Sequence, residues 1–188
     1  MLAASDIRPH PFGSGQDFLE ALVDLTPGCV LLDLKMPGMD GFRIMGELAT
    51  RGIDWPVVVI TGHGEVPTAV RAMKAGAVDF IEKPFGEAAL LSTLENAFRL
   101  LDEREATGQR LRAARERVSQ LTARESEVLE GLLAGESNKQ IAQRLGISLR
   151  TVEMHRGNMM DRLQVGNLAE ALALALEAGL KPAHDPVQ

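Results

Sequence analysis

The chain has 188 residues, a net charge of −6 and a hydrophobic content of 45%, which suffices for a buried core. No apolar run approaches the roughly 18 to 20 residues of a membrane span. The first residues lack the pattern of a secretion signal, and a single cysteine excludes an internal disulfide. These features exclude a membrane-spanning or disulfide-stabilised secreted protein and predict a cytoplasmic one.

The charges divide the chain. Residues 1–98 hold 7 Lys and Arg against 13 Asp and Glu, whereas residues 99–120 hold 6 against 4 and residues 121–188 hold 7 against 9. An acidic first part followed by an arginine-bearing connector predicts two units with different roles. Neither part is basic enough to indicate nucleic-acid binding by charge alone.

The first part alternates between short apolar runs and amphipathic stretches. The apolar runs predict strands buried on both faces, at 30–33, 57–61 and 78–81. Apolar residues at helical spacing predict helices at 40–52, 65–77 and 87–101. A weaker strand and helix are expected at 7–12 and 15–25. Four strands that alternate with four helices predict an α/β fold with a parallel sheet.

Three polar side chains fall at or just beyond the carboxyl ends of these strands, namely Asp33, Thr61 and Lys83. Because parallel strands end at the same edge of a sheet, these side chains should converge. An aspartate carboxylate can attack a phosphoryl group, while a hydroxyl and an ammonium can hold the phosphoryl oxygens. The spacing therefore predicts phosphoryl chemistry at Asp33.

The single cysteine, Cys29, lies in the apolar run before Asp33 and is expected to be a buried structural thiol.

The segments "LLDLKMPGMDG" and "VVVITGHGEVPTAVRAMKAGAVDFIEKPF" resemble the receiver domain of two-component response regulators, most closely the FixJ-like group. The resemblance covers residues 6–105 and implies a flavodoxin-like fold and a cognate sensor histidine kinase. By this resemblance Asp33 is the phosphoacceptor, Thr61 the switch hydroxyl and Lys83 the ammonium that pairs with the phosphoryl group. Phe80 is then the aromatic residue that turns inward when the threonine moves.

The same resemblance implies a Mg²⁺ ion bound by Asp33 and by the backbone carbonyl of Lys35. It also implies a cis peptide bond between Lys83 and Pro84. His63 follows the strand expected at 57–61 and is expected to be a solvated loop residue, not a phosphate or metal ligand.

Receiver domains begin with a strand that ends in adjacent acidic residues, which hold the Mg²⁺ ion. This sequence begins with "MLAASDIRPHPFGSG", which matches the end of the first receiver helix and the second strand. The first strand and the acidic pair have no counterpart, and Asp6 precedes a different strand. Two explanations remain open: a start further upstream, or an N-terminally truncated receiver with exposed strand edges. Without the acidic pair, the sequence leaves Mg²⁺-dependent phosphorylation of Asp33 open.

Residues 99–120 are charged and rich in helix formers, with one interrupting glycine, Gly108. They predict a solvated helical linker, with at most a weakly apolar face through which two copies of the chain could associate. The expected division is a receiver domain at 1–105, a helical linker at 106–120 and an all-α domain of four helices at 121–188.

Capping residues mark the helices of the last part. Thr122 and Glu125 form a capping box before the first helix, Ser137 or Asn138 opens the second, and Ser148 opens the third. The second helix ends at Gly146, and a fourth is expected at about 168–178. A short helix, a glycine-bearing turn and a helix opened by serine are typical of a helix-turn-helix.

The stretch "TARESEVLEGLLAGESNKQIAQRLGISLRTVEMHRGNMMDRL" resembles the LuxR/FixJ-type DNA-binding domain. The resemblance implies a recognition helix at about 149–163 in the major groove of double-stranded DNA. Residues that would face bases or sugars are Thr151, Glu153, Met154 and Gly157, and those that would face phosphates are Lys139, Arg150, His155 and Arg156. For His155 and Arg156 the alternative is a helix-surface role without DNA contact.

Few cations in this domain predict weak DNA binding by one copy, so a homodimer on a two-fold site is the expected binding form. The apolar last helix is either the dimer face or part of its own domain's core.

The predicted function is a DNA-binding response regulator, not an enzyme, that is switched by phosphorylation of Asp33. The alternative is a constitutive DNA-binding protein whose truncated receiver only mediates dimerisation or ligand sensing. A phosphatase is disfavoured because position 35 is lysine and not a second acid.

Overall fold

A computed structural model describes residues 7–36, 38–62 and 66–182 of the chain. These residues fold into two compact units, 1–105 and 106–188, and each is described by itself. Within the described ranges, no helix has the length and apolarity needed to cross a membrane.

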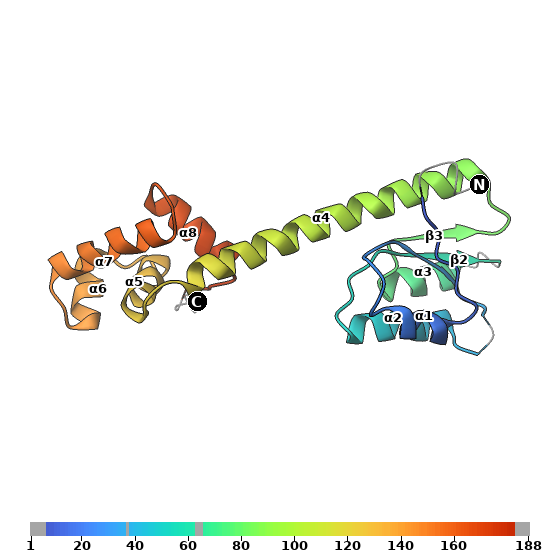
Figure 1. Cartoon of the computed structure of the whole chain (residues 1–188), viewed down its shortest axis with the longest axis horizontal. Coiled ribbons are helices and arrows are strands. Elements are labelled where there is room, and N and C mark those ends of the chain that lie inside the picture. Colours follow the sequence, from blue (N-terminus) through green and yellow to red (C-terminus); the bar gives the residue numbers. More distant parts are fainter. Residues whose placement is uncertain (1–6, 37, 63–65, 183–188) are drawn as a thin grey trace. The chain divides into compact units, whose positions relative to one another are not determined.

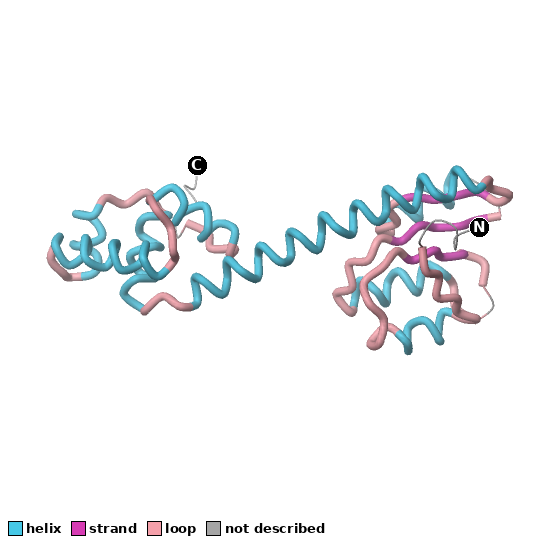
Figure 2. Tube along the Cα trace, turned by 45° about the horizontal axis from the view of Figure 1, so that its top comes forward, coloured by secondary structure: helices cyan, strands magenta, loops and turns pink. Residues whose placement is uncertain are grey.

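The first unit is built on a parallel sheet. Its strands are β1 (Val30–Asp33), β2 (Val57–Thr61) and β3 (Asp79–Glu82), in the order β1-β2-β3. They lie side by side in Figure 2. In the register, Asp33 lies opposite Ile60 and Thr61 lies opposite Glu82. The predicted α/β class with a parallel sheet is confirmed.

Helices cover both faces of this sheet (Figure 1). On one face, α1 (Gly15–Ala21) and α2 (Gly41–Thr50) bury residues such as Phe18 and Ile44 against Val57 and Val59. On the other face, the first turns of α4 (Glu87–Ser119) bury Leu90 and Leu94 against Val58 and Ile81. The remaining helix, α3 (Val66–Lys74), adds Ala72 to the first core. This three-layer packing holds the strand ends in fixed positions.

The strand expected at 7–12 is wrong: the described sheet has three strands, and residues 7–12 belong to none of them. Pro9 and Pro11 have no amide proton, so two positions of this segment cannot donate to a strand ladder. The ring of Phe12 instead packs edge-on against Phe18, with 5.4 Å between the ring centroids.

The helical linker expected at 99–120 is confirmed up to Ser119, because α4 continues through Gly108 to this residue. One glycine costs a helix only about 1 kcal/mol, and the surrounding sequence is rich in strong helix formers. The last turns of α4 belong to the second unit, where Ala114 is buried in the core. Arg117 donates there to the carbonyl oxygens of Leu163 and Gln164.

The second unit is helical, as predicted. Its helices after α4 are α5 (Ala123–Leu133), α6 (Asn138–Leu145), α7 (Leu149–Arg162) and α8 (Leu168–Glu177). The capping box of Thr122 and Glu125 is present, and so is a second one formed by Ser137 and Gln140. Gly146 ends α6 with a φ of 66°, a left-handed conformation that favours glycine. Helices α6 and α7 thus form a helix-turn-helix.

Candidate functional site

The candidate site of the first unit lies at the carboxyl ends of the three strands. The Lys83 ammonium, just after β3, lies 2.6 Å from one carboxylate oxygen of Asp33, at the end of β1. The backbone N–H of Lys35 donates to the other oxygen at 2.9 Å. Between these strands, the Lys83 amide donates to the Thr61 carbonyl at 2.8 Å. Residues 50 positions apart in the sequence therefore share one charged site.

The electrostatics of this site keep the carboxylate ionised. Burial would raise the pKa of Asp33, but the hydrogen bond and positive charge of Lys83 and the Lys35 amide outweigh it. The net result is an Asp33 pKa below its ordinary value. The Asp33 side chain is 32% exposed, so an ionised oxygen nucleophile lies within reach of a phosphoryl donor.

Helix α2 packs closely against the strand end that carries Asp33. The Asp40 carboxylate accepts from the Phe42 amide and caps this helix. A methyl group at Gly41 would lie 3.1 Å from the Asp33 carbonyl oxygen and 3.1 Å from the Leu34 Cα. Both contacts are with backbone, so only a residue without a side chain fits here unless the strand end moves.

We expect Gly41→Ala to destabilise the first unit by about 1 kcal/mol, because the added methyl group crowds the backbone beside Asp33. Urea unfolding followed by the fluorescence of Trp55, the single tryptophan, reports this unit. The matched control is Gly46→Ala on the same helix, where an added methyl group meets nothing within 4 Å. It should stabilise by about 0.5–1 kcal/mol, and equal effects of both changes would contradict the account.

The predicted switch residues differ in exposure. Thr61 is buried at 4% exposure, whereas the Phe80 ring is 40% exposed and faces solvent in this structure. Three other large apolar residues on α3 are exposed as well, namely Val66, Val70 and Met73. The resemblance implies that Phe80 turns inward when Thr61 moves, and in this structure Phe80 is in the outward, exposed position.

Two further expectations about this region agree with the structure. The Lys83–Pro84 peptide bond is cis. Cys29 is half-buried, and burial raises the pKa of its thiol to about 11, which makes it an unreactive structural residue. His63 lies outside the described residues.

Receiver domains generally use Mg²⁺ for phosphorylation, and Asp33 and the Lys35 carbonyl are the ligands expected from the sequence. Both carboxylate oxygens of Asp33 already have partners, one of them a cation at 2.6 Å. The described part of the chain gathers no group of three or more His, Cys, Asp or Glu side chains that would hold a metal. The described residues alone therefore do not fit a Mg²⁺ site.

The candidate site of the second unit is the outward face of α7. Its inward face buries Val152 and Met159, which are fully covered. Of the residues predicted to meet DNA, Lys139, Arg150, Glu153 and Met154 are exposed, and Thr151, His155, Arg156 and Gly157 are partly buried. Ser148 caps the helix and its hydroxyl lies 2.7 Å from that of Thr151. The exposed set includes the hydrogen-bond donors Lys139 and Arg150 and the acceptor Glu153, groups that can pair with phosphates and base edges.

Arg156 differs from the other predicted DNA contacts because its guanidinium has a partner inside the protein. Its Nη1 donates to the side-chain oxygen of Asn138, the first residue of α6, at 2.7 Å. Its Nε is buried without a hydrogen-bond partner among the described residues.

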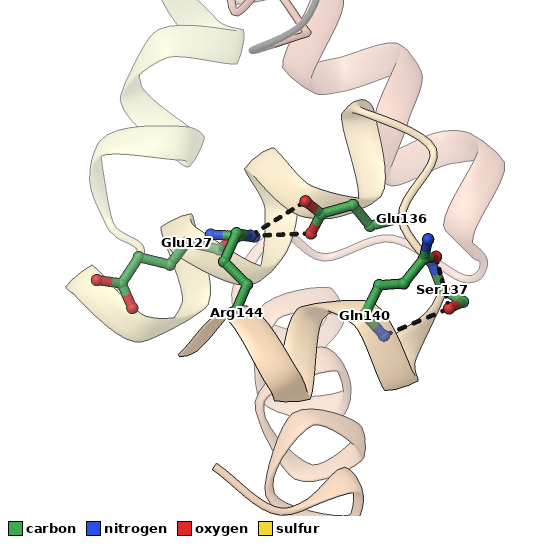
Figure 3. A network of polar contacts seen from close by, with 5 residues as sticks. All are labelled: Glu127, Glu136, Ser137, Gln140 and Arg144. Carbon is green, nitrogen blue, oxygen red and sulfur yellow. Dashed lines mark hydrogen bonds and ion pairs between the residues drawn. The ribbon is translucent and has the colours of Figure 1, made fainter. Parts of the chain in front are cut away.

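A polar network that the sequence does not reveal locks α5 to α6 (Figure 3). The Arg144 Nε donates to both carboxylate oxygens of Glu136, at 3.1 and 2.9 Å, and its Nη2 donates to the Glu127 carbonyl at 3.1 Å. Its guanidinium passes over Gly131, where a methyl group would lie 2.5 Å from Arg144 Nη2 and 2.8 Å from Ile141 Cγ1. In the sequence, only Gly131, a glycine inside an otherwise helical stretch, indicates that α5 and α6 pack closely at this point.

We expect Gly131→Ala to destabilise the second unit by about 1–2 kcal/mol, because the added methyl group displaces Arg144 or the buried Ile141. The expected 1–2 kcal/mol is the net loss, after the gain of about 1 kcal/mol that alanine brings to a helix. Urea unfolding followed by far-ultraviolet circular dichroism measures it. Gly157→Ala on α7, where a methyl group meets nothing within 4 Å, is the control and should stabilise. Stabilisation by both changes would rule out the proposed crossing.

Two family profiles match the chain, one to each unit. The profile described as "Response regulator receiver domain" matches residues 1–95. The profile described as "Bacterial regulatory proteins, luxR family" matches residues 119–175.

Curated relatives and solved structures agree with these profiles. The chain is 44% identical to the transcriptional regulatory protein FixJ of Bradyrhizobium diazoefficiens over 172 residues, which cover 90% of this chain and 82% of that protein. It is 42% identical to FixJ of Rhizobium meliloti, over 97% of this chain and 89% of that one. The structure of the response regulator StyR is similar with a TM-score of 0.79 and 39% identity, over 94% of this chain and 89% of that chain.

Proposed function

Since the chain belongs to the DNA-binding two-component response regulators of the FixJ/LuxR type, we propose that phosphorylation of Asp33 controls its binding to DNA. Members of this family are transcriptional regulators and not enzymes, and their receiver domain implies a cognate sensor kinase.

In the proposed reaction an ionised oxygen of Asp33 attacks the phosphorus atom of a phosphoryl donor. A new oxygen–phosphorus bond forms, the bond from phosphorus to the donor breaks, and the donor leaves with that electron pair. Lys83 is already 2.6 Å from the carboxylate, so it can follow the negative charge onto the phosphoryl oxygens. The Thr61 hydroxyl, from the next strand end, is proposed to bind the phosphoryl group as the switch residue.

The observation that carries this proposal is the Asp33–Lys83 contact between strand ends. A carboxylate paired with one lysine is also common in purely structural ion pairs. Here, however, the pair lies at the carboxyl edge of a parallel sheet, where ligands bind in open α/β folds. The pKa of Asp33 is lowered and its side chain is accessible, which suits an acceptor.

The signal is proposed to reach DNA through dimerisation. The exposed apolar residues of α3 and β3, including Val70, Met73 and Phe80, are proposed to form the receiver's dimer face once Phe80 and Thr61 respond to the phosphoryl group. A homodimer would present two α7 helices to a two-fold site on double-stranded DNA. The proposed contacts are Lys139, Arg150, Thr151, Glu153, Met154, His155 and Gly157, and the proposed location is the cytoplasm.

Intact-mass measurement after treatment with acetyl phosphate tests the chemistry, with and without added Mg²⁺. The wild-type chain should gain the mass of one phosphoryl group, and Asp33→Asn should gain none. Asp40→Asn is the matched control, because Asp40 is a nearby exposed carboxylate that caps α2. A wild-type chain that gains no mass, or a gain that persists in Asp33→Asn, would instead favour constitutive DNA binding.

A further inference from the structure

We infer that Arg156 positions the DNA-reading helix by holding Asn138, and that it does not itself contact DNA. The inference rests on the proposed reading of DNA by α7. It changes the role of the residue in a measurable way, because a phosphate contact and a positioning contact respond differently to salt.

The contact joins the two helices of the helix-turn-helix. Arg156 lies in the middle of α7, and its Nη1 donates to the Asn138 oxygen at 2.7 Å across a sequence separation of 18 residues. Among the described residues, this is the side-chain hydrogen bond that links α6 directly to α7. The two helices otherwise meet through apolar side chains such as Ile141 and Val152, both fully buried. Apolar packing tolerates sliding more readily than a directed bond from a charged donor.

The backbone around Asn138 is held in place by neighbouring hydrogen bonds. It is the first residue of α6, directly after Ser137, whose side chain and backbone are both bonded to Gln140 in a capping box. The local backbone is therefore fixed before Arg156 binds. An arginine that holds this point sets where the middle of α7 lies relative to α6.

The surroundings of Arg156 oppose a phosphate contact. Its Nε is buried and has no hydrogen-bond partner in the part of the chain that the structure describes, so part of the guanidinium is already withdrawn from solvent. A phosphate contact through Nη1 would compete with the Asn138 bond, which already takes a charged donor from that nitrogen. Arg150, by contrast, is exposed six residues earlier on the same helix and can meet a phosphate without any rearrangement.

The test compares three variants of the full chain with Arg150→Met as the matched control: Arg156→Met, Asn138→Ala and the double variant. The probe is a duplex selected from a random pool by the wild-type chain, with a scrambled duplex of the same composition beside it. Affinity is measured over a series of salt concentrations, at a temperature where circular dichroism shows every variant folded. Asn138→Ala removes only the acceptor, so it remains informative if Arg156→Met folds poorly.

We expect Arg156→Met and Asn138→Ala each to weaken binding to the selected duplex by about tenfold, and the double variant to lose about tenfold and not a hundredfold. The slope of log affinity against log salt should stay unchanged in all three, whereas Arg150→Met should reduce it by about one.

A slope reduced by about one in Arg156→Met, with no change of affinity or slope in Asn138→Ala, would overturn the inference in favour of a phosphate contact. Unchanged affinity in both single variants would overturn it in favour of a purely stabilising bond. Loss of selected-duplex binding in Arg150→Met alone would leave DNA reading by α7 intact while refuting the role of Arg156.

Discussion

Replacing Lys83 with methionine should slow the phosphorylation of Asp33 by about 100-fold, the typical effect of removing one charge that stabilises a transition state. Methionine keeps the length and apolar stem of the side chain but removes the ammonium 2.6 Å from the carboxylate. Negative charge that builds up on the phosphoryl oxygens would then lose its nearest described cation. The rate is measured by intact mass after timed exposure to acetyl phosphate.

The same variant should also change the titration of Asp33. Burial raises the pKa of this carboxyl, and Lys83 is the main group that opposes it. Without Lys83 the Asp33 pKa should therefore rise, which carbon-13 NMR of the labelled carboxyl can follow. Lys74→Met, at an exposed lysine at the end of α3, is the control and should change neither quantity. A phosphorylation rate unaffected by Lys83→Met would contradict the role given to this residue.

The second large effect is expected at Glu125, a carboxylate that is 2% exposed. It accepts from the Thr122 amide at 2.9 Å and lies 2.9 Å from the Arg162 Nε, so it joins the start of α5 to the end of α7. Glu125→Ala removes half of a capping box and leaves Arg162 without this partner. We expect the second unit to lose about 3 kcal/mol of stability. Urea unfolding followed by circular dichroism measures it.

The pH dependence of stability gives a second readout for Glu125. Burial raises its pKa, but the Thr122 hydrogen bonds and the Arg162 charge lower it below the ordinary value. A carboxyl whose folded-state pKa is depressed stabilises the fold above its unfolded pKa of about 4.3, and this stability disappears as the pH falls through the folded-state pKa. The second unit of the wild type should therefore weaken below about pH 4. Glu125→Gln should flatten that part of the profile.

Glu130→Ala on the same helix is the control for Glu125, because Glu130 is exposed. It should change stability by less than about 0.5 kcal/mol. If Glu125→Ala were as mild as Glu130→Ala, the bridge from α5 to α7 would contribute nothing to the fold.

Features governed by local sequence were predictable. The apolar runs at 30–33 and 57–61 gave the strands, and the capping residues Thr122 and Ser148 gave the starts of α5 and α7. The edge of a parallel sheet brings Asp33 and Lys83 together because strand order follows chain order here. The strands and helix starts depend on patterns a few residues long, and the Asp33–Lys83 contact follows from the parallel order of the strands.

Features that depend on how elements cross were not predictable. The segment 7–12 was apolar enough for a strand, but its prolines and the absence of a described partner strand leave it outside the sheet. The Arg144 network and the Arg156–Asn138 bond each need a particular approach of two helices. The spacing of charged residues along one helix does not predict that approach, so the sequence did not predict that Arg156 is partly buried with a partner inside the protein.

The most direct test of the account measures the affinity of the chain for a selected duplex before and after acetyl phosphate treatment, in wild type and in Asp33→Asn. A coupling of 5- to 150-fold is usual between two linked sites, so we expect wild-type affinity to rise by at least about tenfold on phosphorylation. Asp33→Asn should bind with the unphosphorylated affinity under both conditions. Equal affinity of the phosphorylated and unphosphorylated wild type, or the same rise in Asp33→Asn, would contradict the claim that Asp33 is the switch.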